Sequence, residues 1–376
     1  QLRVTFEYES DGLWNSAVEA LMGRHVLHLD IIDYPGEWLL DLPLLTTSFE
    51  DWSREAMRLA QEPLRSKHAA AWLDFAETLD PAAAQDEAAA AKGAELFRSY
   101  LAACRDASQV LSTVPPGRFL LPGDLAGSPA LTFMPLELGD AADALAGSLH
   151  AMMARRYEAY KTTVIKPFYR DHFARLDRQI VLVDALAALN AGPAAVADLE
   201  RALEAVLASF KTGANSWLSA ILGKRIDKLM FAATKADHLH EASHDRLKAI
   251  LGALTEKARG QADFAGAETT IEAIASVRAT RQGTAKQNDE ELPCIVGTPM
   301  PGEVIGDTRF HGNREAAIFP GDLPGDPVAA LKGCMPEATD TAFVRFRPPV
   351  GDDARAPLPH IRLDRVLQFL LGDRLT

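Results

Sequence analysis

Apolar residues follow two kinds of pattern along the chain, and five short stretches have the pattern of β-strands. Residues 1–9 alternate apolar with polar side chains, which predicts a half-buried strand. Residues 24–33 form a second strand, whose end is apolar. Three later stretches are almost continuously apolar, as strands buried in parallel sheets are: QIVLVD (179–184), LMFAAT (229–234) and TIEAIAS (270–276).

Helical spacing covers most of the remaining chain. Over about 41–173, apolar residues recur at intervals of three and four, and the Ala-rich stretch 82–91 is a strong helix former. Further helices are expected over about 194–223, over 242–258 and at the end of the chain. Beyond residue 290, frequent Gly and Pro indicate short strands and loops.

The alternation of strands with helices predicts an α/β fold with a doubly wound, mostly parallel sheet. The long helical block is too long for a loop and too helical for the sheet, so we read it as an insertion. The predicted domains are a core of 1–46 and 176–289, a helical insertion of 47–175, and a β-rich segment of 290–376 with a terminal helix.

Charge and cysteine content narrow the expected partners. The 376 residues hold 39 Lys and Arg against 52 Asp and Glu, a net charge of −13. A negative field disfavours phosphate backbones and anionic lipid surfaces, so nucleic acid is not an expected partner. Cys104, Cys294 and Cys334 are far apart, which is typical of reduced thiols in a cytosol and argues against a disulfide framework. We expect a cytoplasmic protein.

One strand ends on a pattern that suggests phosphate chemistry. In LHLDIIDYPGEW (27–38), Asp33 and Gly36 form D-x-x-G directly after the apolar run. In phosphate-transferring enzymes an aspartate at such a strand end holds Mg²⁺, usually through water, and a glycine amide can approach a γ-phosphate because no Cβ obstructs it. Taken alone, D-x-x-G is also a common surface turn.

Two further motifs stand at the ends of later strands. Thr234-Lys235-Ala236-Asp237 follows the strand LMFAAT, where a lysine stem can lie against a purine and a carboxylate can accept from guanine N1–H and the exocyclic amine. Alternatively, Asp237 caps a helix. Ser276-Val277-Arg278 ends the next strand, where a backbone amide can meet guanine O6. Three motifs in order, at the edge where α/β sheets bind ligands, favour a nucleotide site.

Several long runs of this chain resemble the YcjX-like family of bacterial stress proteins, which are P-loop GTPases with a helical insertion. The resemblance extends over essentially the whole chain, and its most specific runs are DYPGEWLLDLPLL (33–45), PGRFLLPGDLAGSPALTF (116–133), HFARLDRQIVLVDALAALNAG (172–192), ATKADHL (233–239) and GNREAAIFPGDLPGDP (312–327).

The resemblance implies a role for each motif residue. Asp33 would be the Mg²⁺-linked aspartate and Gly36 the γ-phosphate sensor, while Glu37 stands where Ras-type enzymes place a water-orienting glutamine. Lys235 and Asp237 would hold the base. Ser276 and Val277 would lie in the loop beside it.

The chain departs from the GTPase pattern in three ways. Thr234 replaces the usual Asn, and Val277 replaces the usual Ala. The phosphate loop G-x-x-x-x-G-K-[S/T] does not occur in these residues, since the only Gly-Lys pair, Gly223-Lys224, precedes Arg225. We therefore expect that an N-terminal segment carrying this loop, its lysine and the Ser/Thr ligand of Mg²⁺ is missing from the chain as given, and that GTPase activity requires it.

The predicted function is guanine-nucleotide binding with slow GTP hydrolysis, in a stress-response switch that acts on an unknown protein client. GTP or GDP with Mg²⁺ would be its ligands. A scaffold that binds nucleotide without hydrolysing it, or an interaction module, is the alternative. His240, Glu241 and His244 spell the zincin pattern H-E-x-x-H, which makes a zinc metallopeptidase a third, weaker hypothesis. Docking of the last helix on a peripheral membrane partner has no support beyond its amphipathic pattern.

Overall fold

A computed structural model describes most of the chain, in residues 1–8, 25–105, 111–139, 144–208, 226–264, 266–287, 290–332, 343–349 and 357–375. The chain divides into two compact units. We call Gln1–Asp33, Asp177–Val196 and Ile226–Thr376 the sheet unit, and Tyr34–Leu176 and Ala197–Arg225 the helical unit. The three-part domain division made from the sequence stays a prediction.

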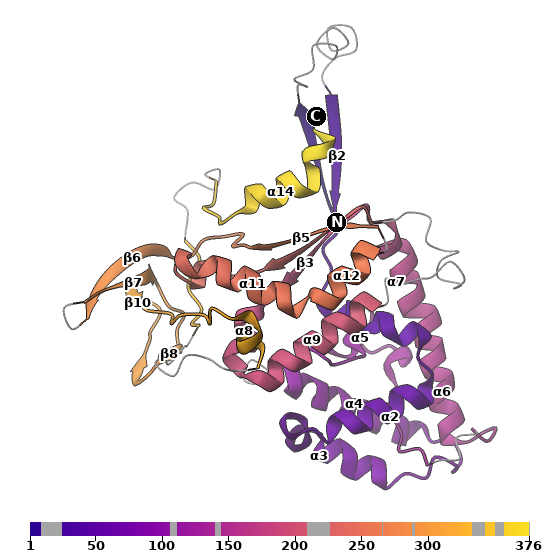
Figure 1. Cartoon of the computed structure of the whole chain (residues 1–376). Helices are drawn as coiled ribbons and strands as arrows, with labels where there is room; N and C mark the ends of the chain where they lie inside the picture. Colours follow the sequence, from indigo (N-terminus) through magenta and orange to yellow (C-terminus); the bar gives the residue numbers. More distant parts are fainter. Residues whose placement is uncertain are drawn as a thin grey trace. The chain divides into compact units, whose positions relative to one another are not determined.

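The sheet unit is built on three parallel strands in the order β3-β4-β5, which confirms a mixed α/β fold (Figure 1). They are β3 (Arg178–Val183), β4 (Lys228–Ala233) and β5 (Glu268–Ala273). The register pairs Val183 with Ala233 and Ala233 with Ala273. All three strands therefore end at the same level, and the residues that follow them meet at one edge of the sheet.

Helices cover both faces of this sheet, because the two sets of alternating side chains on β4 pack against different elements. Met230 and Ala232 lie in one apolar cluster with Val366 of α14 (Leu363–Leu371). The neighbouring Phe231 is in register with Ile271, whose Cδ1 lies 3.2 Å from the position of a Cβ on Gly252 of α11 (His244–Leu254). Thus α14 packs on one face and α11 on the other.

The rest of the sheet unit consists of smaller sheets and short helices. Strands β1 and β2 form an antiparallel hairpin in which Leu2 pairs with Ile31, and the second small sheet has the order β10-β7-β6. The bounds are β1 (Leu2–Tyr8), β2 (His25–Ile31), β6 (Arg281–Gln287), β7 (Glu290–Gly297), β8 (Val304–Ile305), β9 (Thr308–Arg309), β10 (Ala316–Ile318), α8 (Ala185–Ala191), α12 (Glu256–Phe264), α13 (Pro327–Leu331) and the 3₁₀ turns η6 (Ala236–His238), η7 (Glu241–Ser243) and η8 (Gly372–Arg374).

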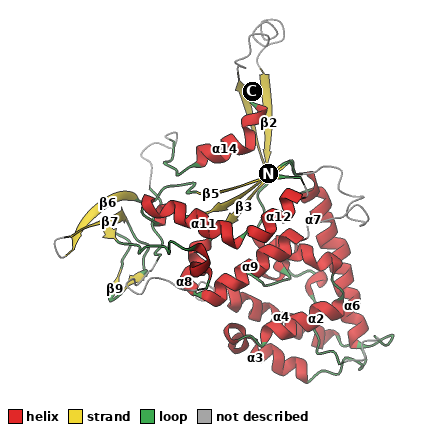
Figure 2. Ribbon diagram, viewed as in Figure 1, coloured by secondary structure: helices red, strands yellow, loops and turns green. Residues whose placement is uncertain are grey.

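The helical unit confirms the helical pattern of the long block between β2 and β3, and helices dominate this part of the chain in Figure 2. Its elements are η1 (Gly36–Thr46), α2 (Phe49–Ala60), α3 (Pro63–Glu77), α4 (Glu87–Arg105), α5 (Gly117–Leu120), η2 (Gly123–Leu125), η3 (Pro129–Leu131), α6 (Leu149–Tyr160), the π-helical turn η4 (Lys161–Ile165), α7 (Lys166–Asp171) and η5 (Phe173–Arg175). Helix α9 (Pro193–Ala208) begins in the sheet unit and continues in the helical unit.

Aromatic side chains form the centre of the helical unit. Trp52 and Trp72 are 3% and 0% exposed, and each stacks on a tyrosine, Trp52 on Tyr157 at 5.0 Å and Trp72 on Tyr100 at 5.3 Å between ring centroids. Each of these rings removes a large apolar area from water. The three-and-four spacing predicted from the sequence is therefore the core-facing stripe of these helices.

The Ala-rich stretch 82–91 is only partly helical, and the prediction was wrong for its first residues. Helix α4 begins at Glu87, while Ala84 forms an isolated antiparallel bridge with Ser148. Asp80 accepts from the N–H of Ala82 at 2.9 Å, and Asp86 accepts from two N–H groups at the start of α4. Aspartate side chains that bond nearby amides compete with helix formation and favour turns and caps.

One predicted helix lies partly outside the residues that the structure describes. The helix predicted over 194–223 is present as α9, and the remainder, with Gly223-Lys224, lies outside the described residues. In the described part of the chain, every helix is too short or too polar to cross a membrane.

Candidate functional site

The T-K-A-D motif forms the loop that follows β4 and is fixed to the end of β3. The N–H of Thr234 donates to the carbonyl of Val183 at 3.0 Å, and its hydroxyl lies 3.4 Å from the same oxygen. The position where the GTPase pattern usually has Asn is therefore occupied by a threonine that still braces the loop against the neighbouring strand.

Lys235 has a backbone conformation that lysine rarely adopts. Its φ of 62° lies in the left-handed region, which costs about 1–2 kcal/mol for a residue with a side chain. Its ammonium forms an ion pair of 2.5 Å with Asp184, the first residue after β3. Asp184 also accepts from the N–H of Ala187 at 3.1 Å and so caps α8. Sequence reasoning assigned Asp184 no role, although it ends the run QIVLVD at the predicted ligand-binding edge.

Asp237 is 3% exposed and connects two of the predicted motifs. Its Oδ2 accepts from the N–H of Ala279 at 2.8 Å, and its carbonyl accepts from the hydroxyl of Thr280 at 2.5 Å. The adjacent Ala236 N–H donates to the carbonyl of Ile274 at 3.0 Å. The T-K-A-D loop and the chain that follows β5 therefore form one connected structure at the carboxyl edge of the sheet.

The carboxylate of Asp237 does not have the role of a helix cap. It lies within the 3₁₀ turn η6, and the N-cap residues of the next two helical segments are His240 and Ser243. The carboxylate instead points across to the loop after β5, as its bond to Ala279 shows.

Ser276 and Val277 lie at the tip of that loop. Ser276 is exposed and Val277 is half-buried. The loop is held on its other side, because Ala275 forms a bridge with Ile361 and Arg278 N–H donates to the carbonyl of Pro359 at 2.7 Å. The structure thus brings Thr234, Lys235, Asp237, Ser276 and Val277 to one edge of one sheet.

The two residues of the D-x-x-G motif belong to different units: Asp33 to the sheet unit and Gly36 to the helical unit. Asp33 follows β2 and is exposed, and among the described residues its carboxylate has no hydrogen bond or ion pair. Gly36 begins the 3₁₀ helix η1 in the helical unit and is also exposed. A Cβ built on Gly36 would meet no atom within 4 Å. Packing therefore does not explain the glycine, and the space beside it is open.

Glu37 has a partner that the sequence did not suggest. Its carboxylate forms an ion pair with Arg105, the last residue of α4, and its side chain is 16% exposed. A Cβ on Gly117 would lie 1.8 Å from the carbonyl oxygen of Glu37, so the two backbones are in direct contact. The residue predicted to orient water is thus held by the helical unit.

The rest of η1 is bound by the segment that begins at Gly117. Trp38 Nε1–H donates to the carbonyl of Leu121 at 3.0 Å, and the Arg118 guanidinium lies 3.3 Å from the Trp38 ring centroid. Asp41, 2% exposed, accepts from the N–H of Gly117 at 2.7 Å. The runs 33–45 and 116–133 are therefore in direct contact with one another.

Asp41 is a buried carboxyl with an unusual titration. The hydroxyl of Tyr160 donates to its Oδ2 at 2.6 Å. Burial raises the pKa of Asp41 from 3.8 to about 6, against the opposing effect of the hydrogen bonds from Tyr160 and Gly117. Burial, with the nearby Asp41 charge, also raises the pKa of Tyr160 well above its ordinary value. Sequence reasoning missed Asp41, whose only signal was a carboxylate within an apolar stretch.

The zinc hypothesis does not fit the observed geometry of H-E-x-x-H. His240 precedes the 3₁₀ turn η7, and its Nδ1 accepts from the N–H of Ala242 at 3.3 Å, whereas His244 begins α11. His244 is 4% exposed, and burial lowers its pKa. Zincin histidines occupy successive turns of one helix. Throughout the described ranges, no three His, Cys, Asp or Glu side chains are grouped so that they could hold a metal ion.

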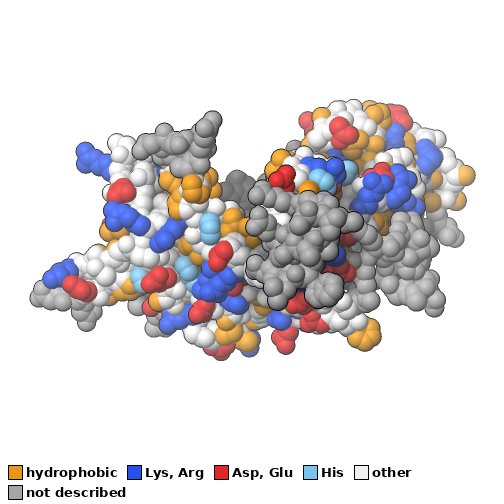
Figure 3. Space-filling model, turned by 90° about the horizontal axis from the view of Figure 1, so that it is seen from above, with side chains coloured by type: hydrophobic (Ala, Val, Ile, Leu, Met, Phe, Trp, Pro, Cys, Tyr) orange, Lys and Arg blue, Asp and Glu red, His pale blue; other side chains and the backbone are white. Residues whose placement is uncertain are grey.

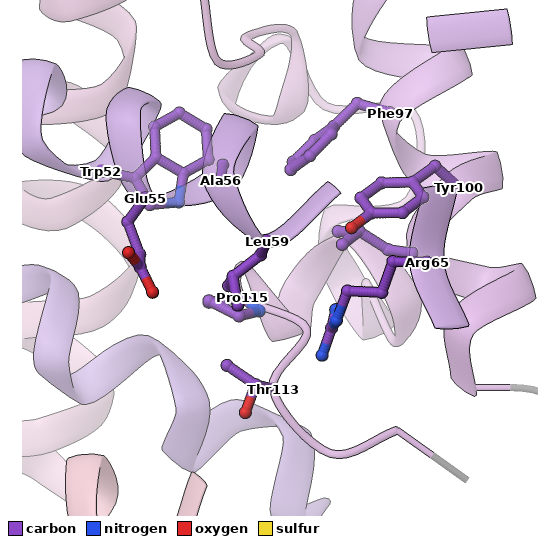
Figure 4. Close-up of a pocket in the computed structure, with 10 residues that line it drawn as sticks. Trp52, Glu55, Ala56, Leu59, Arg65, Phe97, Tyr100, Thr113 and Pro115 are labelled. Atoms are coloured by element: carbon purple, nitrogen blue, oxygen red, sulfur yellow. The ribbon is translucent and has the colours of Figure 1, made fainter. Parts of the chain in front are cut away.

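The helical unit contains a mostly apolar pocket that includes none of the predicted nucleotide residues (Figure 4). Trp52, Phe97 and Tyr100 line it together with the guanidinium of Arg65, which is 1% exposed. Arg65 forms an ion pair of 2.6 Å with Asp198, itself 1% exposed. On the face shown in Figure 3, Lys and Arg lie interspersed with Asp and Glu, without a continuous basic patch among the described residues.

Comparison with known proteins gives one consistent result. The model of the YcjX-like family, DUF463, matches residues 1–375. A protein of Escherichia coli (strain K12) named Ras-like GTPase YcjX is 37% identical over 382 residues, an alignment that covers 100% of this chain and 78% of the relative. A protein of the same name from Shewanella oneidensis is 32% identical over 394 residues, covering 100% of this chain and 76% of that relative.

Proposed function

Because this chain belongs to the YcjX-like family, we propose that it binds guanine nucleotides and hydrolyses GTP slowly as a Ras-like GTPase. The site would be the carboxyl edge of β3-β4-β5, where the T-K-A-D loop and the loop after β5 meet. This is where parallel α/β sheets bind their ligands.

The observation that supports the proposal best is the position of Asp237. Its carboxylate is almost fully buried and oriented by Ala279 N–H, yet only one acceptor position of Oδ2 is used by that bond. An ionised carboxylate has about four acceptor positions, so both oxygens can still accept from guanine N1–H and the exocyclic amine. Adenine lacks that pair of donors. A fixed carboxylate at this place would therefore select guanine.

Asp33 fits the Mg²⁺ that such a nucleotide carries. Its exposed carboxylate at the end of β2 has no competing partner among the described residues, and Mg²⁺ prefers oxygen ligands from one or two carboxylates together with phosphate and water. Mg²⁺ bound there would neutralise charge on the phosphates. Gly36, with open space on the side where a Cβ would be, would let its amide approach the γ-phosphate.

The contacts of η1 support a role as a switch. Glu37, Trp38 and Asp41 are each bonded within the helical unit, so a ligand that moves Gly36 would act on elements bonded to the helical core. We propose that this segment transmits the nucleotide state to a protein client during stress.

A second candidate function has one specific observation in its favour. Glu37, in the position of the water-orienting glutamine, is paired with Arg105. A carboxylate held by an arginine is less available to a water molecule, which favours a protein that binds GTP without hydrolysing it. Single-turnover hydrolysis of GTP by the wild type and by Arg105→Ala separates these candidates. A hydrolase turns over as the wild type, whereas a scaffold whose Glu37 is withheld by Arg105 does not, and gains turnover only when Arg105 is replaced.

The test of guanine recognition is a substitution at Asp237. Asp237→Asn replaces one guanine-facing acceptor with a donor, so the affinity for GDP should fall and that for XDP, which offers a carbonyl at C2, should rise. Titration of a fluorescent nucleotide with GDP, XDP and ADP as competitors measures all three affinities. Asp364→Asn, an exposed position on α14, is the matched control. Unchanged GDP and XDP affinities in D237N would exclude Asp237 as the base-reading residue.

A further inference from the structure

Lys235 has a left-handed backbone conformation and lies two residues before Asp237, the residue proposed to recognise the base. Apart from Arg362, it is the only residue other than glycine in the described part of the chain with a positive φ. Such strain persists only where the surroundings determine it, and it is concentrated at functional sites. The carbonyl of Lys235 accepts from His238 N–H at 2.9 Å, and the next amide, that of Ala236, is bound by Ile274.

The side chain of Lys235 is fixed as well as its backbone. Its ammonium is 2.5 Å from Asp184 Oδ2, although the lysine side chain is 43% exposed. A lysine at such exposure ordinarily samples many rotamers. The ion pair directs the side chain back along the sheet edge, from the end of β4 to the end of β3.

Asp184 is a rigid anchor because its other oxygen is already engaged. Oδ1 accepts from Ala187 N–H and caps α8, while the preceding carbonyl, that of Val183, accepts from Thr234. Val183, the last residue of β3, therefore binds Thr234, and the next residue, Asp184, binds Lys235. An isolated surface ion pair contributes little to stability, but this one joins two fixed backbones at a ligand-binding edge.

We propose that Asp184 is a positioning residue of the nucleotide site, which holds the Lys235 ammonium so that the lysine stem forms a preformed wall of the base-binding slot beside Asp237. The inference rests on the proposed function, since it assigns a role within the same site. A preformed wall raises affinity because the ordering of the lysine does not have to accompany binding.

The proposal is tested by a double-mutant cycle that measures the affinity for fluorescent GDP in the presence of Mg²⁺. The variants are made in the full-length protein. Asp184→Asn removes the charge but keeps an oxygen to cap α8, since Asn caps helices as well as Asp does. Lys235→Met keeps an apolar stem and removes the ammonium. Asp326→Asn is the matched control, because Asp326 caps α13 through the same kind of bond, to Val328 N–H at 2.9 Å, and has no place in the site.

The expected result is that D184N weakens GDP binding by about threefold to thirtyfold, within the usual range of coupling between neighbouring residues. In the K235M background the same substitution should cause no further loss of GDP affinity, because the ammonium that Asp184 binds is then absent. D326N should bind GDP like the wild type. A purely structural Asp184 would lower the melting temperature without this dependence on Lys235.

Two outcomes would overturn the proposal. GDP affinity of D184N equal to that of the wild type would show that the ion pair does not position the lysine, and an equal loss in the presence and absence of Lys235 would show that Asp184 acts by another route. A wild type that does not bind GDP would refute the proposed function, and this inference with it. If D184N melts early, salt provides a second measurement: raising ionic strength should weaken GDP binding more in the wild type than in K235M, and an equal weakening refutes the anchor.

Discussion

The buried carboxyl of Asp41 makes a quantitative prediction for the pH dependence of stability. Its pKa in the folded protein is about 6, against an ordinary value of 3.8, because burial disfavours the ionised form. A difference of this size corresponds to about 3 kcal/mol between the two protonation states, at 1.36 kcal/mol for each factor of ten. At neutral pH, where Asp41 is ionised, its desolvated carboxylate destabilises the folded state by about that amount.

The sign follows from proton binding. Between pH 4 and 6, folded Asp41 is largely protonated while the unfolded chain has released its proton, so the folded state binds more protons and stability falls as pH rises. The contribution of Asp41 is therefore most favourable below pH 4 and is lost as pH passes through about 6. The expected loss between pH 4 and pH 7 is about 2 kcal/mol.

Asp41→Asn isolates this effect, because other groups titrate over the same range. The Asn oxygen can accept from Gly117 N–H, and its NH₂ can donate to the hydroxyl of Tyr160, so the hydrogen-bond pattern is preserved without charge. The free energy of unfolding of the wild type minus that of D41N should therefore be about 2 kcal/mol lower at pH 7 than at pH 4. Asp74→Asn, an exposed change on α3, should show no such difference.

Urea unfolding followed by tryptophan fluorescence is the appropriate assay, since Trp38, Trp52 and Trp72 all lie in the helical unit with Asp41. A stability difference between wild type and D41N that is constant from pH 4 to 8 would refute the reasoning. A difference of the opposite sign would mean that the hydrogen bonds from Tyr160 and Gly117 outweigh burial, and that the carboxylate is stabilised when ionised.

Three further predictions follow from other contacts. Asp33→Ala should abolish the dependence of nucleotide binding on Mg²⁺, measured by titration with and without a chelator; a retained dependence would remove Asp33 from the metal site. Glu37→Ala should leave GTP bound and slow its single-turnover hydrolysis by about tenfold to a thousandfold if the carboxylate orients water; wild-type turnover would leave that role to another group. Asp198→Ala should lower the free energy of unfolding by about 3–5 kcal/mol, because it removes the short ion pair of a buried guanidinium and leaves Arg65 only the more distant Glu62, at 3.6 Å. Arg54→Ala is its control, because it removes an ion pair whose two side chains are more than half exposed, and it should lower the free energy of unfolding by less than about 1 kcal/mol. Equal effects of the two substitutions would show that the ion pair of Arg65 does not stabilise the core.

The elements of the fold were largely predictable, since their patterns are local. All five stretches predicted as strands are strands, and the parallel pairing of β3, β4 and β5 agrees with the apolar runs in β3 and β4. The prediction for the Ala-rich stretch was wrong in its first residues because helix propensity is a weak preference. Asp80 bonds the amide of Ala82 in a turn, and Asp86 bonds the first amides of α4, so the helix begins only at Glu87.

The placement of the proposed site residues was predictable where they stand at strand ends and not where it depends on distant partners. The common position of Thr234, Lys235 and Asp237 could be predicted because parallel strands bring their carboxyl ends to one edge. The pairing of Lys235 with Asp184 joins residues 51 positions apart, and nothing local distinguishes that aspartate from an ordinary helix cap. The same holds for Arg105, whose contact with Glu37 depends on how α4 packs. Loop positions and side-chain partners follow from tertiary packing, which periodicity does not encode.

The contact between Gly117 and Glu37 has a consequence for how sequences of this family can change. Any side chain at position 117 would place its first carbon within 1.8 Å of a carbonyl oxygen, so even alanine requires the backbone of η1 to move. Movement there would disturb the bond between Asp41 and the Gly117 amide. We therefore expect that relatives which keep this arrangement retain glycine at the position, and that substitutions elsewhere in the two contacting segments accumulate in compensating pairs.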